Sequence, residues 1–424
     1  ELTDYVVDDA DLAAADPPPE FTRWRLHGTV DVPVNEQFGL LFGFGRSQSE
    51  VDYAISDAYG GTFRGLNSTS DNFLVKGKYE FANGISLVSS LVYSPYESEY
   101  ANANGIDNLI VTQGGGLTFK TEIDGETGVY DWLVRASYVD ADMSREASPY
   151  NYSWDSDAPS IDFCTNTNCA TGGFGDLEQY QRDYTLEAEA SRDLLGGLFS
   201  FGGEVGIVDA FKARNEESRA YSRGSYDENT VCADASDLAC IDGEIALPVY
   251  FAYLAYEANV EIAQASVWAE QASSFGPVDV RAGVRVSTDD YLENTNIAPR
   301  LSAVWNINDD WQLTGGANRY YTRNFVGYAI REQYPDFYRY ERSATVSGTD
   351  LIYSEDDWAL ASTTTLTGYR DAGLETPYSD ELTAALTFPA LDLVDGLGRL
   401  KVVHRQHRNQ IVRSPREDIT EYDD

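Results

Sequence analysis

The chain has 424 residues, enough for a large core or about three ordinary domains, and a run of about 18 apolar residues that would predict a transmembrane helix does not occur. Its formal net charge of −40 excludes a nucleic-acid-binding surface, which requires clustered lysine and arginine. Aromatic residues make up 13%, beside 35 glycines and 1 methionine, a composition typical of strands and turns and not of helix bundles.

The first residues, ELTDYVVDDADLAAADPPPEF, predict an acidic, proline-bearing loop. There is no initiator methionine and no signal peptide, so we expect a mature protein or a piece of one.

After this loop, apolar and polar residues alternate with period two over segment after segment, which predicts about fourteen strands. The expected spans are 22–33, 37–54, 71–82, 84–97, 107–122, 129–144, 178–193, 197–212, 250–273, 277–290, 297–307, 310–323, 378–389 and 398–413. Many exceed the usual soluble strand of about 5–6 residues and reach the roughly 9–11 residues that a tilted strand needs to cross a bilayer.

The connections between these strands alternate in length. The short ones are 34–37, 82–84, 124–128, 194–197, 275–277, 306–310 and 391–398. The longer, polar ones are 55–70, 98–106, 145–177, 213–248, 291–296 and 324–377. Short turns on one side and long loops on the other are typical of outer-membrane barrels, whereas a soluble sandwich has no reason to sort its loops by length.

The two faces of the expected strands differ in chemistry. On 277–290, Val280 and Val284 share a face opposite Arg281 and Arg285. We expect lipid to contact the apolar face, at positions Val280, Val284, Leu301, Trp305, Trp311, Leu386 and Phe388. The sequence therefore predicts an all-β fold: a transmembrane, antiparallel, up-and-down β-barrel.

Four cysteines fall in two close pairs, Cys164 with Cys169 and Cys232 with Cys240. Both gaps are too long for the usual zinc-ligand spacing, so two disulfide clips in outer loops are expected instead. Each clip would stabilise its loop by about 2–3 kcal/mol and implies an oxidising compartment.

Residues 277–413 resemble the barrel of TonB-dependent outer-membrane transporters. The resemblance rests on Ala282 to Arg285, on Pro299 to Ala303 after a short loop, on the turn Asp309-Asp310, and on Trp311 to Tyr321. The segments SDELTAALTF (379–388) and LKVVHRQHRNQIVR (400–413) are similar to the strands that follow in that family.

The resemblance implies a barrel of 22 strands in the outer membrane of a Gram-negative bacterium, with an N-terminal plug domain. Neither the plug nor the family's energy-coupling box is recognisable here, and the chain ends on EYDD instead of an aromatic residue. We therefore expect residues 1–424 to be a single transmembrane β-barrel domain that forms part of a longer protein.

Two groups of residues are candidate ligand contacts. Arg281, Arg285 and Arg300 lie on the expected luminal faces, where they could bind an anionic ligand or the plug, or simply pair with acidic residues such as Asp279. The loop 324–377 and the strand end before it combine aromatic rings with guanidinium groups, which suits stacking and bidentate hydrogen bonds. The candidates there are Tyr320, Arg323, Tyr328, Tyr334, Tyr338, Arg339 and Tyr340; the alternative is packing of loop against loop.

The sequence gives little support for a metal-binding or catalytic site. His404 and His407 are three residues apart on an expected strand and so point to opposite faces, which argues against a metal pair. Motifs of nucleophilic, phosphate-binding or metalloprotease sites are absent from the sequence, so we expect neither an enzyme nor a cofactor.

The function that the resemblance implies is active import of a scarce small-molecule ligand, of the siderophore, cobalamin or oligosaccharide type. The implied partners are outer-membrane lipid and lipopolysaccharide, the plug domain and the inner-membrane TonB complex, with no nucleic acid. The alternative is a passive, porin-type diffusion channel, which would also need a wet lumen.

Overall fold

The computed structural model describes residues 2–5, 20–54, 63–101, 105–163, 169–365, 373–389, 396–411 and 421–422. Within these ranges, no helix has the length and the apolar character needed to cross a membrane.

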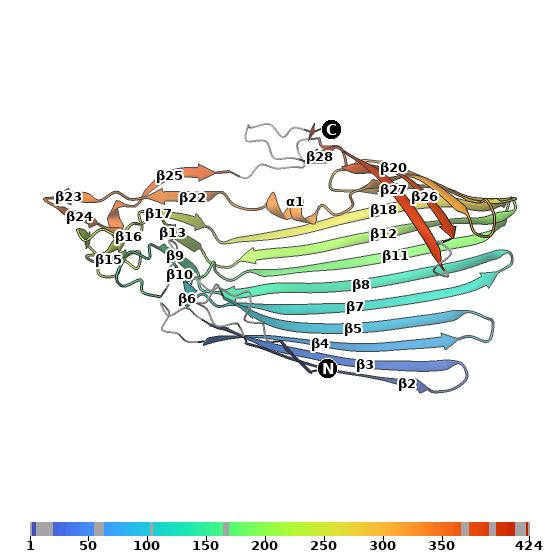
Figure 1. Cartoon of the computed structure of the whole chain (residues 1–424), viewed down its shortest axis with the longest axis horizontal. Helices are drawn as coiled ribbons and strands as arrows, with labels where there is room; N and C mark the ends of the chain where they lie inside the picture. Colours follow the sequence, from blue (N-terminus) through green and yellow to red (C-terminus); the bar gives the residue numbers. More distant parts are fainter. Residues whose placement is uncertain are drawn as a thin grey trace.

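One large antiparallel sheet of 15 strands runs through most of the chain (Figure 1). In order across the sheet, its strands are β1 (Leu2–Tyr5), β2 (Glu20–Pro33), β3 (Phe38–Ala54), β4 (Phe63–Glu80), β5 (Ser86–Tyr100), β7 (Ile110–Thr127), β8 (Tyr130–Ala147), β11 (Glu178–Leu194), β12 (Gly197–Arg214), β18 (Tyr256–Phe275), β19 (Val278–Asp289), β20 (Asn296–Asn306), β21 (Gln312–Tyr321), β26 (Tyr378–Pro389) and β27 (Leu397–Arg408). The antiparallel, up-and-down β-barrel fold predicted from the alternation is confirmed. The short β1 lies in the segment that was expected to be a loop and pairs with β2; this strand was not predicted.

Tight turns join the strands at one end of the sheet and longer connections at the other (Figure 1). The side-chain oxygen of Asn35 accepts hydrogen bonds from the backbone N–H groups of Gln37 and Phe38, both at 2.9 Å, which closes the β2–β3 turn. Between β11 and β12, Leu195 and Gly196 have φ of 52° and 71°, the left-handed pair that a two-residue hairpin requires. The alternation of loop lengths in the sequence therefore corresponds to the two ends of the sheet. The expected turn at 391–398 falls mostly outside the described residues.

The strand register aligns apolar side chains in continuous rows on one face. Phe42 is the direct neighbour of Val30 on one side and of Val75 on the other, and Val75 continues the row to Leu91 and Phe119. Large apolar side chains that stay exposed on one face of a sheet, with charges on the other, mark the surface that contacts lipid.

The residues expected to face lipid lie on this apolar surface. Val284, Leu301, Trp305 and Trp311 are between 39% and 51% exposed. Val280, Leu386 and Phe388 share their face and are half-buried, the last because its ring packs on Trp311 with centroids 5.8 Å apart.

Beyond the long-loop end of the main sheet, the connections form a second sheet, which we call the outer cap (Figure 1). Its 7 strands, in order, are β25 (Ala359–Thr364), β22 (Phe337–Glu341), β17 (Val249–Tyr253), β13 (Ser218–Ser222), β9 (Tyr150–Trp154), β10 (Cys169–Gly172) and β6 (Gly105–Ile106). Smaller pieces extend it: β14 (Thr230–Cys232), β15 (Cys240–Ile241), β16 (Ile245–Ala246), β23 (Thr345–Ser347), β24 (Asp350–Tyr353) and the short 3₁₀ turn Glu355–Asp357. The remaining elements are α1 (Val326–Arg331), β28 (Gln410–Ile411) and β29 (Glu421–Tyr422).

The outer cap corrects one expectation from the sequence. The span 250–273, expected as a single strand, is divided at Leu254 and Ala255 into β17, which belongs to the cap, and β18, which belongs to the main sheet. Alternation continues across this break, so only the strands that pair with each half could have revealed it.

Spin labels on β19 test the two-faced architecture. Nitroxides at Ala282 and Val284 should collide with oxygen dissolved in lipid, because these positions share the apolar face. Nitroxides at Arg281 and Gly283 should respond to a water-soluble relaxation reagent. Equal accessibility of neighbouring positions from 280 to 286 would contradict the barrel.

Candidate functional site

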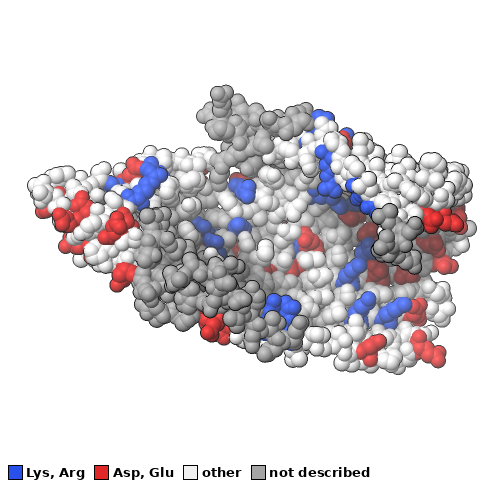
Figure 2. All heavy atoms as spheres, viewed as in Figure 1, with Lys and Arg blue, Asp and Glu red and all other residues white. Residues whose placement is uncertain are grey.

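The luminal face of the main sheet carries acidic and basic side chains interspersed with one another, as Figure 2 shows for its hollowed side. Arg135 on β8 lies between two carboxylates of the neighbouring strands: its Nε is 2.9 Å from Glu122 and its Nη1 is 3.0 Å from Glu187. Lys120 adds a second cation 3.4 Å from Glu122. Glu122, Arg135 and Glu187 thus form a chain of ion pairs across three neighbouring strands.

Glu204 on β12 is the centre of the next group. One carboxylate oxygen lies 3.2 Å from Arg285 on β19, and the other forms an ion pair with Arg323, just beyond β21. Arg285 also donates to the hydroxyl of Ser266 at 2.6 Å and lies over the ring of Trp268, 5.2 Å from its centroid. Glu204 thereby ties the start of the 324–377 connection to the barrel wall.

The segment after Arg323 folds inward and packs on the luminal face of β12 and β18. The ring of Phe325 is only 1% exposed, in a cluster that the two strands and the β19–β20 connection supply: Val208, Ala210, Val260, Ile262 and Tyr291. Beyond α1, Gln333 exchanges two hydrogen bonds with the backbone of Asn259, at 3.0 and 2.6 Å. The segment 323–333 is thus held at three points along the wall.

A hollow that we call the recess lies next to this segment and is lined by both polar and apolar side chains. It has a volume of about 360 Å³. Residues of β11, β12, β18 and the inward segment line it. The polar ones are Gln181, Asp183, Thr185, Glu204, Gln264, Arg323 and Asn324; the others are Tyr184, Gly206, Ile207, Val208, Ile262, Phe325 and Val326.

The three luminal arginines that the sequence singled out have different surroundings. Arg281 pairs with Glu270 at 3.1 Å and Arg285 pairs with Glu204, so acidic neighbours neutralise both. Asp279, which the sequence suggested as a partner for these arginines, forms no ion pair with them. Its carboxylate instead accepts hydrogen bonds from the side chains of Ser274 and Asn306, at 2.5 and 3.0 Å.

Arg300 differs from the other two. It lies over the ring of Tyr320, 5.5 Å from the centroid, and has no carboxylate partner among the residues that the structure describes. Tyr320 is 43% exposed. The sequence named both residues as candidate contacts, and the structure brings them together on the open wall.

Most aromatic candidates of the 324–377 connection pack within the protein. Tyr340 stacks on Tyr250 with centroids 4.8 Å apart, and Tyr338 lies against the same core of the outer cap. Tyr334 packs on Tyr256 at 4.9 Å. Tyr328 contacts Phe325 at 6.3 Å, and Arg339 pairs with Glu341. Packing of loop against loop, the alternative weighed from the sequence, describes Tyr338 and Tyr340, whereas Tyr334 packs on β18 of the main sheet.

The core of the outer cap is a ladder of aromatic rings across its strands. Tyr152 on β9 stacks between Trp154 and Tyr221, with centroids 5.6 and 4.9 Å away, and Tyr250 follows on β17 at 5.1 Å from Tyr221. Burial raises the pKa of Tyr152 and of Tyr250 to about 12, from an ordinary 10.0. The phenol groups are therefore held in their neutral form.

Arg342 is a residue that sequence reasoning did not single out, because its place in a long loop gives no sign of burial. Its side chain is 0% exposed and forms an ion pair with Asp237, itself 1% exposed. It also donates to the Ala239 carbonyl oxygen at 3.2 Å and lies over Trp358, 4.5 Å from the centroid. The Arg342–Asp237 pair thus joins the 324–377 connection to the 213–248 connection.

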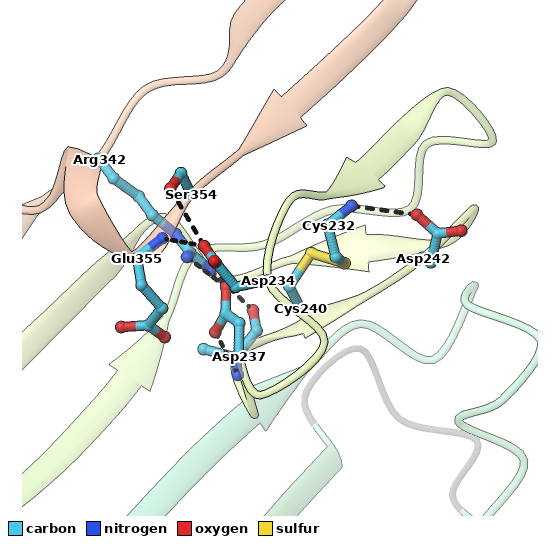
Figure 3. The surroundings of a disulfide bond; sticks show 9 residues. Cys232, Asp234, Asp237, Cys240, Asp242, Arg342, Ser354 and Glu355 are labelled. Carbon is cyan, nitrogen blue, oxygen red and sulfur yellow. Dashed lines mark hydrogen bonds and ion pairs between the residues drawn. A yellow bond between two sulfur atoms is a disulfide. The ribbon is translucent and has the colours of Figure 1, made fainter.

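Next to this pair, a disulfide joins Cys232 and Cys240, whose Cα atoms are 5.9 Å apart (Figure 3). This confirms the second predicted clip. The first involves Cys164, which lies outside the described residues, so that pairing stays a prediction; Cys169 is disulfide-bonded and buried.

His404 and His407 lie opposite Leu382 and Ser379 in the register of β26 and β27, and so on opposite faces, as expected.

Replacing Arg342 by methionine should loosen the outer cap. Asp237 would keep a buried charge without a partner, which costs about 3–5 kcal/mol. Amide hydrogen exchange in β17 and β22 should then accelerate. The matched control is Arg339→Met, whose partner Glu341 is partly exposed, so that the cost is below about 1 kcal/mol. Equal exchange rates in the two variants would contradict a central role for the buried pair.

Alkaline pH should open the cap. The raised pKa values mean that the folded cap keeps phenol protons that the unfolded chain would lose, so its stability is fully present below pH 10.0 and falls as pH approaches about 12. Near-ultraviolet circular dichroism of the stacked rings would follow the transition. Tyr250→Phe should move it to higher pH, and Tyr226→Phe, at an exposed site, should leave it in place; the reverse result would refute this account.

No family model matches the chain. Among curated proteins, the uncharacterised protein YddB of Escherichia coli strain K12 is 24% identical in an alignment 426 positions long that covers 95% of this chain and 48% of YddB. The chain thus spans about half the length of this relative.

Solved structures agree. The outer membrane transporter YddB from Escherichia coli matches with a TM-score of 0.70 and 20% identity, over 95% of this chain and 48% of that one. A variant of the ferric enterobactin receptor PfeA from Pseudomonas aeruginosa matches with a TM-score of 0.55 and 14% identity, over 94% and 52%. The siderophore receptor PirA from Acinetobacter baumannii gives 0.53 and 12%, over 94% and 51%. The resemblance to the barrel of TonB-dependent outer-membrane transporters is therefore confirmed at the level of the fold.

Proposed function

We propose that the chain is part of a TonB-dependent outer-membrane transporter that imports a scarce small molecule. The observation that carries the proposal is the combined architecture: a transporter-type barrel sheet, a hollow lined by charged side chains, and an outer cap over the long-loop end. A protein that captures a ligand outside and passes it inward needs each of these parts. Chemistry on the ligand is not part of the proposal.

The ligand would first meet the outer cap and then the luminal wall. Arg300 and Tyr320 are the most suitable contacts there, because an exposed ring under an unneutralised guanidinium can stack on a ligand and donate hydrogen bonds. The other three arginines would contribute less to ligand binding, because each already forms an ion pair with a carboxylate: Arg281, Arg285 and Arg323. Tyr328, Tyr334, Tyr338, Arg339 and Tyr340 would act chiefly by shaping the cap and the inward segment.

The remaining parts of the proposal concern the whole protein. We infer that residues 1–424 are one transmembrane domain of a 22-stranded barrel in a Gram-negative outer membrane. Within the described residues, β1 and β27 each pair on one side only, which suits completion of the barrel by further strands. Outer-membrane lipid and lipopolysaccharide would contact the apolar face, and a plug domain would couple the lumen to the inner-membrane TonB complex.

Uptake by intact cells tests this function. Cells producing the full-length protein would be given labelled ferric siderophores, cobalamin and trisaccharides, with and without a working TonB complex. One of these should accumulate only when both protein and complex are present. Accumulation that is independent of the complex would contradict active transport and favour the passive channel.

The same cells test the luminal contact. Arg300→Ala combined with Tyr320→Ala should weaken uptake affinity at least about tenfold, the loss expected of a central anchor. Arg281→Ala serves as the control, because Glu270 neutralises that arginine. An unchanged affinity with an intact barrel would remove Arg300 and Tyr320 from the site.

A further inference from the structure

Three positively charged side chains gather at the outer ends of β8 and β12, and we call them the basic patch: Arg145, Lys212 and Arg214. The strand register brings them together. Arg145 forms a bridge with Leu177, the residue before β11, and the pairing of β11 with β12 places Leu177 opposite Arg214. Neighbouring strands are about 4.8 Å apart, so the backbones of Arg145 and Arg214 are separated by about 10 Å.

The basic patch faces the lumen. Strand alternation gives Arg145 the same face as Arg135 on β8, and it gives Lys212 and Arg214 the same face as Glu204 on β12. Figure 2 shows basic side chains on the hollowed side of the molecule over the outer end of β12, which Figure 1 labels. A ligand that enters the lumen therefore has access to these charges.

No carboxylate forms an ion pair with any of the three cations in the part of the chain that the structure describes. The acidic residues close to Arg214 along the chain and on the next strand have other partners. Glu217 pairs with Arg219, and Glu257 accepts a hydrogen bond from the side chain of Asn259 at 2.8 Å. The charge of the patch is thus uncompensated.

Arg145 marks the edge of the patch. It also lines a second hollow, of about 800 Å³, together with six acidic residues: Asp71, Glu97, Asp142, Glu146, Asp176 and Glu178. Strand alternation puts Asp142, Glu146 and Glu178 on the face of the wall opposite to Arg145, and Asp176 accepts from the backbone N–H of Ala147 at 2.9 Å. Lys212 and Arg214 lie outside the lining of this acidic hollow and form the centre of the patch.

The guanidinium groups of the patch have unused hydrogen-bond donors. The Nε atoms of Arg145 and Arg214 are buried and have no partner among the described residues. Burial lowers the pKa of Arg214, and the positive charge of Arg145 lowers it further, so its surroundings disfavour the charged form. An anion would supply both the missing acceptors and the missing counter-charge.

Aromatic rings border the patch on the side of the inward segment. Tyr256 on β18 is the direct neighbour of Arg214, and Tyr334 packs on it with centroids 4.9 Å apart. The Nζ atom of Lys212 lies 5.8 Å from the centroid of Tyr334. The wall therefore supplies the cations and the inward segment supplies a flat side, which together suit an anionic group attached to a planar or apolar body.

We propose that the basic patch binds an anionic group of the transported ligand, such as a carboxylate, at the outer end of the lumen. The proposal rests on the proposed function and narrows it: at least one part of the ligand carries negative charge. The chain as a whole has a net charge of −40 and repels anions. A patch of uncompensated cations would concentrate an anionic ligand at one place on the luminal wall.

Three matched probes test the charge preference on the purified full-length protein. They are benzene-1,3,5-tricarboxylate, the corresponding tricarboxamide and 1,3,5-tris(aminomethyl)benzene, which share one ring but are negative, neutral and positive. Isothermal titration calorimetry should show the tricarboxylate binding at least about tenfold more tightly than either other probe. Absence of tricarboxylate binding, or equal or tighter binding of another probe, would overturn the proposal.

A pair of double variants locates the binding. Lys212→Met with Arg214→Met removes two charges, retains long side chains, and should weaken tricarboxylate binding at least about tenfold. The control is Lys78→Met with Lys120→Met, which removes two luminal charges that already lie 2.7 and 3.4 Å from carboxylates; binding should stay within about twofold. Equal affinities in the two double variants would refute the patch.

An exchange variant separates charge from shape. Lys212→Arg with Arg214→Lys keeps both charges and should retain tricarboxylate binding within about fivefold. A loss as large as that of the methionine variant would contradict an electrostatic site. Heat-modifiable electrophoretic mobility would verify that every barrel is folded.

The outcomes separate this inference from the proposed function. Energised uptake by the wild type, together with a methionine variant that binds the tricarboxylate as tightly as the wild type, refutes the patch alone. Tricarboxylate binding that the methionine variant loses, in a protein that shows no energised uptake, supports the patch and refutes active transport.

Discussion

The architecture depends on one constraint: inside a membrane, every backbone N–H and C=O group must find its partner in the protein. The antiparallel ladder meets that demand for the strands between β2 and β27, and its two-residue period separates lipid-facing from luminal side chains. The row through Phe42 and Val75 and the opposite row through Arg135 and Glu204 are two results of the same pairing. The strand register therefore decides, as much as the amino-acid composition does, which side chains face the lumen.

The same period explains why the sequence predicted the wall so well. Long, regular alternation and turn residues such as Asn35 are local signals, and the observed strands agree with the expected ones to within a few residues over most of the wall. The outer cap could not be predicted from such local signals, because its strands are short and pair with segments far away in the sequence. The break at Leu254 and the burial of Arg342 depend on those distant partners, which a single local window cannot contain.

The candidate site was predictable only in part. Face parity placed Arg281, Arg285, Arg300 and Tyr320 correctly in the lumen, but parity does not say which acidic neighbour neutralises which arginine. Glu270 and Glu204 take that role, and Arg300 keeps its charge available. The recess could not be predicted from the sequence, because the residues that line it from 323 to 326 return to β11, β12 and β18 from another part of the chain.

The outer cap draws its strands from the connections after β5, β8, β12 and β21, and packs them around one aromatic ladder. The loops of a simpler barrel can lengthen, shorten or diverge one at a time. Here a substitution at Tyr152 must be accommodated by Tyr221 and Tyr250, which belong to a different connection. In evolution these loops are bound to change together, so a lineage that acquires a new ligand must remodel the cap as a whole or make its changes in the lumen beneath it.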